Sequence, residues 1–193
     1  HFLAHIMTNT DWEVVGIASF RHKGWCDRIR EITKDHPDWL HRFVIITHDL
    51  NAPFSPITKD LIGPIDYIIS MASLSDVEAS IKDPVPFVQN NVNLILYLLE
   101  YAREIKPEVF IQISTDEVYG SIAKGSFTEE SPFAPNSPYA ASKAGGDLLC
   151  RSYFATFKTP VIVTHSCNFL GANQYPEKLI PLFITNLLEG KKV

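Results

Sequence analysis

The sequence predicts an α/β fold with a doubly wound parallel sheet. Short apolar runs rich in Val, Ile and Phe recur along the chain, as buried parallel strands require. Longer segments with apolar residues at helical spacing separate several of these runs. The run at residues 109–113 leads into Thr115, Asp116 and Glu117. Open α/β sheets place their chemistry at this end of a strand, so these polar residues indicate a functional site.

The individual elements follow from the same patterns. Predicted strands cover residues 13–18, 43–47, 65–70, 109–113 and 160–164. Predicted helices cover residues 1–8, 25–33, 83–105 and 138–157. Residues 55–61 form a poor helix, which Gly63 and Pro64 end.

Length, charge and cysteine content exclude several classes of protein. A chain of 193 residues can form one domain whose core needs no disulfides. The formal net charge of -5 and the lack of a basic stripe argue against nucleic acid as a partner. No apolar run is long enough to span a membrane. Three cysteines without metal-ligand spacing indicate free thiols and no metal, so we expect a cytoplasmic protein.

Tyr139 and Lys143 form a candidate proton-transfer pair. They lie four residues apart in a predicted helix and therefore share one face. A free tyrosine has a pKa of about 10, and Lys143 is placed to lower it. Thr115 is available to hydrogen-bond the same substrate oxygen, while Asp116 and Glu117 supply a second acid/base set. Two such sets indicate a reaction of several steps.

Motifs in a fixed order resemble a known family. Thr-Asp-Glu-Val-Tyr-Gly at 115–120 precedes Ser-Pro-Tyr-Ala-Ala-Ser-Lys at 137–143, and Asn168 precedes Pro-Glu-Lys-Leu-Ile-Pro at 176–181. This order resembles the extended short-chain dehydrogenase/reductases of the epimerase/dehydratase family. The chain is most similar to the nucleotide-sugar 4,6-dehydratases of the dTDP-glucose type. Tyr-x-x-x-Lys alone is a weak signal, because helices produce it by chance, whereas the ordered set is specific.

The resemblance implies a Rossmann-like sheet that opens with a strand and a glycine-rich turn for the cofactor pyrophosphate. No G-x-x-G-x-x-G motif occurs in the sequence, and residues 1–8 resemble the rear of the helix that follows this turn. We therefore expect residues 1–193 to form a partial dinucleotide-binding domain. It would lack the first strand, the glycine-rich turn and the C-terminal substrate domain, and would be inactive alone.

The end of the first predicted strand bears on the choice of cofactor. Dinucleotide folds usually carry an acidic residue there for the adenosine ribose, whereas this chain has Ala18. Ser19, Arg21, His22 and Lys23 follow, and such a loop can accept the extra phosphate of NADP. A solvated basic loop is the alternative. The expected cofactor is therefore NAD or NADP.

The resemblance assigns further cofactor contacts. Asp49, with Leu50 beside it, matches the position next to adenine, although Asp49 alternatively only starts the turn at 51–53. Ala72 and Ser73 match the loop on the nicotinamide side. Tyr139 and Lys143 also contact the cofactor in the family.

The resemblance also assigns substrate contacts, to Ser75, Asn168, Glu177, Lys178 and Leu179. For Lys178 the alternative is an ordinary lysine on a helix surface. Where the dehydratases read Ser-His-Val-Asp-Arg-Ser, residues 75–80 read Ser-Asp-Val-Glu-Ala-Ser. This departure leaves the sugar and the nucleotide base open.

The implied reaction is 4,6-dehydration of a nucleotide sugar. Carbon 4 is transiently oxidised, water leaves across carbons 5 and 6, and hydride returns to carbon 6. A nucleotide-sugar 4-epimerase is the alternative, although it does not need Asp116 and Glu117. A non-catalytic cofactor-binding relative is a second alternative, and it would be expected to lose Tyr139 or Lys143.

The wide apolar stripe of the predicted helix 83–105 indicates burial on two sides. In the family this helix and the Tyr139 helix form a four-helix bundle between two subunits, so we expect a homodimer. An ordinary core helix in a monomer is the alternative.

Overall fold

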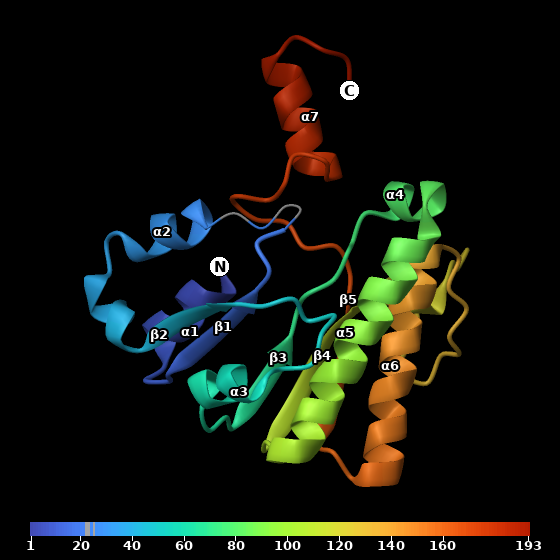
Figure 1. Ribbon diagram of the computed structural model, residues 1–193. Coiled ribbons are helices and arrows are strands. Elements are labelled where there is room, and N and C mark those ends of the chain that lie inside the picture. The colour runs from blue at the N-terminus through green and yellow to red at the C-terminus, as the bar shows by residue number, and fades with distance from the viewer. Residues whose placement is uncertain (22–23, 25) are drawn as a thin grey trace. The chain divides into compact units, whose positions relative to one another are not determined.

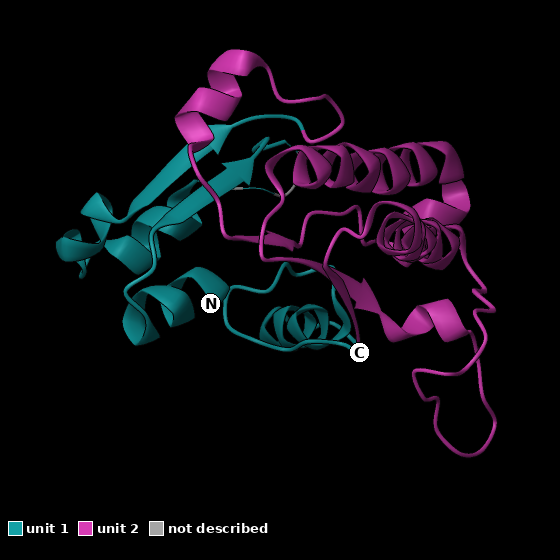
Figure 2. Cartoon of the chain, turned by 90° about the horizontal axis from the view of Figure 1, so that it is seen from below, with its two compact units in different colours: residues 1–49, 168–193 teal, residues 50–167 magenta. Residues whose placement is uncertain are grey.

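The computed structural model describes residues 1–21, 24 and 26–193. The chain forms two compact units, residues 1–49 with 168–193 and residues 50–167 (Figure 2). None of the described helices combines the length and the apolarity that a bilayer span requires.

The first unit is built on a pair of parallel strands. β1 (Val14–Ala18) lies beside β2 (Phe43–Thr47), with Val14 opposite Phe43. The other elements of this unit are α1 (Phe2–Asn9), α2 (Asp27–Thr33), η1 (Pro37–His41) and α7 (Leu179–Leu188). The Arg42 guanidinium donates at 3.0 Å to the carbonyls of Met7, Thr10 and Trp12, and so fastens α1 to the start of β1.

The second unit contains a three-stranded parallel sheet covered by two long helices. β4 (Val109–Thr115) lies between β3 (Tyr67–Ser70) and β5 (Val161–Ser166). Figure 1 shows α5 (Pro84–Ile105) and α6 (Pro138–Phe157) side by side along this sheet. The core between them consists of Leu94, Ile95, Leu98, Leu99, Ala102, Phe110, Cys150 and Tyr153. This core fixes α6 against β4.

Both long helices begin and end where the sequence provides the local signals. Each has proline in its first turn, where no N–H partner is needed. Each ends at a lysine with left-handed backbone, Lys106 with φ 53° and Lys158 with φ 60°. The shorter helices α3 (Pro56–Ile62) and α4 (Val77–Lys82) are capped by the side chains of Ser55 and Asp76.

The predicted α/β class is confirmed, and strands lie at all five predicted positions. β4 is longer than predicted, so that Thr115 is its last residue rather than a residue after it. α4 was not predicted as a helix, because its six residues are too few to show a periodicity. The predicted start of a helix at Trp25 lies outside the described residues, as do His22 and Lys23, and α2 begins at Asp27.

Candidate active site

The end of β4 turns at once into a short helix that carries two carboxylates. The Thr115 hydroxyl accepts a hydrogen bond of 3.3 Å from the Glu117 N–H, which caps η2 (Asp116–Tyr119). The same hydroxyl donates to Asp116 Oδ1 at 3.3 Å. Thr115, Asp116 and Glu117 therefore lie within one turn of the chain at the carboxyl end of the central strand of this unit.

The start of α6 is held so that Tyr139 lies near this turn. The Ser137 hydroxyl accepts from the Ala140 N–H at 3.1 Å, and the Ser80 hydroxyl accepts from the Tyr139 N–H at 3.2 Å. Thr115 lies close enough to the Tyr139 phenol to lower its pKa. Tyr139 and Lys143 are both buried. The second unit thus brings together all five residues predicted to be catalytic.

Burial and nearby charges set the acidity of Tyr139. Burial, and next the negative charge of Glu117, raise the pKa of Tyr139 to about 12, against a smaller lowering by the hydrogen bond with Thr115. The pKa of Tyr139 thus lies above its ordinary value, and the expected lowering by Lys143 stays a prediction. The physical reason is that burial and nearby carboxylates both favour the neutral phenol.

Lys143 joins α6 to the central strand. Its ammonium donates a hydrogen bond of 2.7 Å to the Ile113 carbonyl on β4. Burial lowers the pKa of Lys143, and the negative charge of Asp147, one turn further along α6, raises it. The side chain therefore holds the helix in register with the strand that ends in Thr115.

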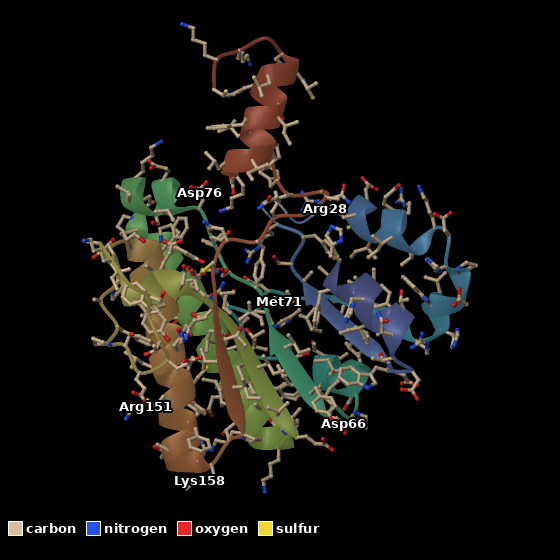
Figure 3. All side chains as sticks on the ribbon, turned by 180° about the vertical axis from the view of Figure 1, so that it is seen from behind. Arg28, Asp66, Met71, Asp76, Arg151 and Lys158 are labelled. Carbon is tan, nitrogen blue, oxygen red and sulfur yellow. The ribbon has the colours of Figure 1, made fainter. Side chains whose placement is uncertain are left out.

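The loop after β3 is held by one buried amide. Figure 3 shows its two ends, Met71 directly after β3 and Asp76 at the start of α4. The Asn91 side chain accepts from the Leu74 N–H at 2.8 Å and donates to the Leu74 carbonyl at 2.9 Å. It also donates to the Ser142 hydroxyl at 2.9 Å. The loop carries three predicted binding residues, Ala72, Ser73 and Ser75.

Four predicted cofactor residues lie in the first unit. Ala18 ends β1, and Ser19 accepts a hydrogen bond from the Arg21 N–H at 3.4 Å. The Arg21 guanidinium forms an ion pair with the Asp49 carboxylate. Two side chains assigned separately, one to a phosphate and one to adenine, are thus bonded to each other. Leu50 begins the second unit and packs against its core.

The predicted substrate residues after β5 also lie in the first unit. Asn168 is exposed, and Leu179 is the first residue of α7. Lys178 stands at the N-cap of α7, with its ammonium 4.0 Å from a Glu177 carboxylate oxygen. These residues and those predicted to be catalytic belong to different units, and their joint role stays a prediction.

Residues that sequence reasoning missed surround Lys143. Asp147, Ser114 and His165 are linked by hydrogen bonds in the second unit. Asp147 follows Lys143 at helical spacing, and this was the available signal. A separate cavity of about 330 Å³ is lined by residues within 53–59 and 97–104 and contains none of the predicted site residues.

Comparison with known proteins shows which family the chain belongs to. The family described as GDP-mannose 4,6 dehydratase matches it over residues 1–193. The chain belongs to this family. The resemblance to extended short-chain dehydrogenase/reductases that act as nucleotide-sugar dehydratases or epimerases is thereby confirmed.

Relatives within this family include dehydratases and epimerases. The low-salt glycan biosynthesis protein Agl12 of Haloferax volcanii is 40% identical over 191 residues, which are 99% of this chain and 59% of Agl12. The crystal structure of a double mutant of DesIV, a dTDP-glucose 4,6-dehydratase from Streptomyces venezuelae with NAD bound, is 37% identical with a TM-score of 0.87. That match covers 98% of this chain and 57% of DesIV.

An epimerase structure is similar to nearly the same extent. UDP-glucuronic acid 4-epimerase from Bacillus cereus, solved with UDP-glucuronic acid and NAD, is 29% identical with a TM-score of 0.84. The match covers 97% of this chain and 60% of the epimerase. The chain therefore spans somewhat more than half the length of these relatives.

Proposed function

We propose that the protein containing this chain is a nucleotide-sugar 4,6-dehydratase. The observation that carries the proposal is the turn after β4, where Asp116 and Glu117 follow Thr115, which lies close to the buried Tyr139 phenol. One proton-handling set suits oxidation of a hydroxyl, and the other suits elimination of water. The DesIV structure, a dTDP-glucose 4,6-dehydratase, is in accord with this assignment.

The first step is assigned to Tyr139, Thr115 and Lys143. Tyr139 takes the proton from the sugar 4-hydroxyl while Thr115 hydrogen-bonds the same oxygen. Because the pKa of Tyr139 is about 12 in the ligand-free protein, the phenol is protonated at neutral pH. Its action as a base therefore needs positive charge close by, and Lys143 is the buried cation of this region.

The second step is assigned to the two carboxylates. A ketone at carbon 4 acidifies the proton on carbon 5, which Glu117 removes, while Asp116 protonates the departing 6-hydroxyl. Bound NAD would accept hydride from carbon 4 and return it to carbon 6 while Glu117 or solvent returns a proton to carbon 5, so that the reaction has no net redox change.

The predicted cofactor residues come from both units. In the first unit β1 ends at Ala18, and in the second β3 leads into the loop that carries Ala72 and Ser73. Ala18 leaves no carboxylate to repel the 2′-phosphate of NADP, which favours NADP. In contrast, Arg21 is paired with Asp49, so its positive charge is not available to bind that phosphate. We propose NAD, which is bound in both the DesIV and the epimerase structures. We further propose that residues 1–193 belong to the dinucleotide-binding part of the protein.

A 4-epimerase is the second candidate, supported by the similarity to the UDP-glucuronic acid 4-epimerase. The two activities separate at carbon 5, which dehydration deprotonates and 4-epimerisation leaves untouched. Turnover of a panel of nucleotide sugars in deuterated water, read by mass spectrometry and NMR, should give a 4-keto-6-deoxy product labelled at carbon 5. A 4-epimer without label would replace the dehydratase assignment by the epimerase one.

We also propose a homodimer in the cytoplasm. Val88 on α5 and Leu148 on α6 are exposed, as expected for helices that meet a second copy. Ile95, which belongs to the apolar stripe of the predicted helix 83–105, is 1% exposed and faces Gly146 of α6 in the same chain, so it lies away from the proposed contact. The three cysteines are free thiols, as is usual in a reducing compartment.

A further inference from the structure

Asp147 lies on α6 one turn after Lys143, and two strands hold its carboxylate. Its side chain is 2% exposed. The Ser114 hydroxyl on β4 donates to Asp147 Oδ2 at 2.6 Å, and His165 Nε2 on β5 lies 3.1 Å from the same oxygen. Ser114 and His165 are opposite each other in the β4–β5 register. Side chains from two neighbouring strands therefore contact the same oxygen of the Asp147 carboxylate on α6.

His165 extends this contact to the turn that carries the second acid/base set. An ionised carboxylate only accepts hydrogen bonds, so Nε2 of His165 carries the proton that points at Asp147. Its other nitrogen, Nδ1, lies 2.8 Å from the Tyr119 hydroxyl. Tyr119 is the last residue of η2, and its ring packs against Phe127 and Phe133. A continuous line of hydrogen bonds thus joins η2, β5 and α6.

The second oxygen of Asp147 is buried without a hydrogen-bond partner among the described residues. Burial raises the pKa of Asp147, while Ser114, His165 and the positive charge of Lys143 lower it. Burial likewise lowers the pKa of Lys143, and Asp147 opposes that effect. Because an isolated buried charge is costly, each of these two groups stabilises the charged form of the other.

The remaining titratable groups around Asp147 are neutral when protonated. They are Tyr139 and Cys150 of α6 and Tyr119 of η2, and burial raises the pKa of all three. His165 is the titratable group on β5, and Lys143 is the cation of the cluster. The charge of Lys143 is therefore balanced here by Asp147.

We propose that Asp147, held by Ser114 and His165, is a positioning residue that keeps the Lys143 ammonium charged beside Tyr139. It acts through Lys143 and does not touch substrate. Its consequence for turnover rests on the proposed dehydratase function, whereas its effect on Lys143 does not.

The direct test is the titration of Lys143 without any substrate. Carbon-13 NMR of labelled lysine ε-carbons follows each lysine against pH, and the Lys143 signal is identified by its loss in Lys143→Arg. In Asp147→Asn the Lys143 midpoint should fall by about 1–3 pH units, as expected when a nearby opposite charge is removed. Ser114→Ala, a milder change, should lower it less. Asp60→Asn on the exposed face of α3 is the control. An unchanged midpoint in every variant that folds overturns the proposal.

A second measurement separates positioning from a structural effect. In the full chain, Asp147→Asn should leave kcat nearly unchanged at neutral pH and reduce it as the pH approaches the lowered Lys143 midpoint, with KM unchanged. The loss should grow as pH rises and vanish at lower pH, where even a weakened Lys143 is protonated. Asp147→Glu, which keeps the charge, should restore activity. An equal loss at every pH contradicts the positioning role. If no nucleotide sugar is turned over, the proposed function fails while the Lys143 titration still decides this proposal.

Discussion

Gly120 and Ala134 approach each other so closely that a Cβ on Gly120 would lie 2.3 Å from the Ala134 carbonyl oxygen. The Ala134 N–H donates to the Val118 carbonyl at 2.9 Å, so the loop after η2 returns to the turn that it left. Gly120 also has a φ of 85°, which side-chain-bearing residues rarely adopt. This contact closes the loop against the helix that carries Asp116 and Glu117.

Gly120→Ala should therefore destabilise the fold by more than its backbone conformation alone requires. Gly63 is a matched control, because it has a φ of 71° but no described atom within 4 Å of an added Cβ. Gly63→Ala should cost about 1–3 kcal/mol of unfolding free energy from strain. Gly120→Ala should cost about 1–3 kcal/mol more, from overpacking. Urea unfolding of both variants measures the difference, and equal losses would show that Ala134 does not constrain this position.

Much of the fold could be predicted from local patterns in the sequence. The limits of α6 were predictable because Pro138 opens it and its helical pattern runs unbroken to Phe157. The limits of β2 were predictable because the apolar run at 43–47 is bounded by polar residues. The positions predicted to be catalytic followed from the order of the motifs, and the structure places Thr115 at the end of β4 and Tyr139 and Lys143 on α6.

The features that sequence reasoning missed depend on contacts between distant segments. Neither the helical spacing of Asp147 nor the strand position of His165 shows that the two side chains meet. The ion pair of Arg21 with Asp49 and the burial of Tyr139 likewise arise only when the chain is folded. The effect of burial on the pKa of Tyr139 could not be predicted, because burial depends on the tertiary packing around the ring.

The raised pKa of Tyr139 predicts a loss of stability at high pH. The folded protein keeps this proton up to about pH 12, whereas the unfolded chain releases it near the ordinary value of 10.0. The contribution is therefore fully present below pH 10 and is lost as pH rises from 10 to 12, by up to about 2–3 kcal/mol. Urea unfolding from pH 8 to 11 should show wild type losing stability relative to Tyr139→Phe. Tyr97→Phe, at an exposed ring, is the control, and parallel curves for wild type and Tyr139→Phe would contradict the shift.

The ion pair of Arg21 with Asp49 predicts the cofactor preference. Because Asp49 forms an ion pair with Arg21, Asp49→Asn should free the guanidinium to bind the 2′-phosphate of NADP. NADP binding should then become several-fold stronger, with a smaller effect on NAD. Isothermal titration of both cofactors to wild type and Asp49→Asn measures this. Arg21→Ala is the control, since it should remove any gain. An Asp49→Asn variant that binds NADP no better than wild type does would show that the ion pair is irrelevant to the choice.

The dimer predicts opposite outcomes for two apolar residues. Leu148 is 53% exposed, so Leu148→Glu should give a folded monomer. Ile95 lies in the core between α5 and α6, so Ile95→Glu should unfold the protein instead. Ile57→Glu on α3, at another exposed apolar residue, should leave the dimer intact. Sedimentation velocity reads all three, and a wild type that is monomeric at high concentration rules out the dimer.

Substitutions of Glu117 and Tyr139 should block different steps of the reaction. Glu117→Gln keeps the shape of the side chain but removes the base, so it should slow water loss by about 10²- to 10⁴-fold. Oxidation at carbon 4 should survive, and reduced nicotinamide should therefore accumulate in a single turnover, visible by its absorbance. Tyr139→Phe should prevent this accumulation, because the 4-hydroxyl keeps its proton.

The comparison is informative because the Glu117 backbone N–H bonds the Thr115 hydroxyl and the Glu117 charge acts on the Tyr139 phenol. Glu130→Gln, an exposed glutamate in the loop that follows, is the matched control and should behave as wild type. A Glu117→Gln variant with wild-type turnover would mean that carbon 5 is never deprotonated by this residue. Asp116 and Glu117 would then not be needed for elimination of water. A 4-epimerase, which needs only Thr115, Tyr139 and Lys143, would account for the site.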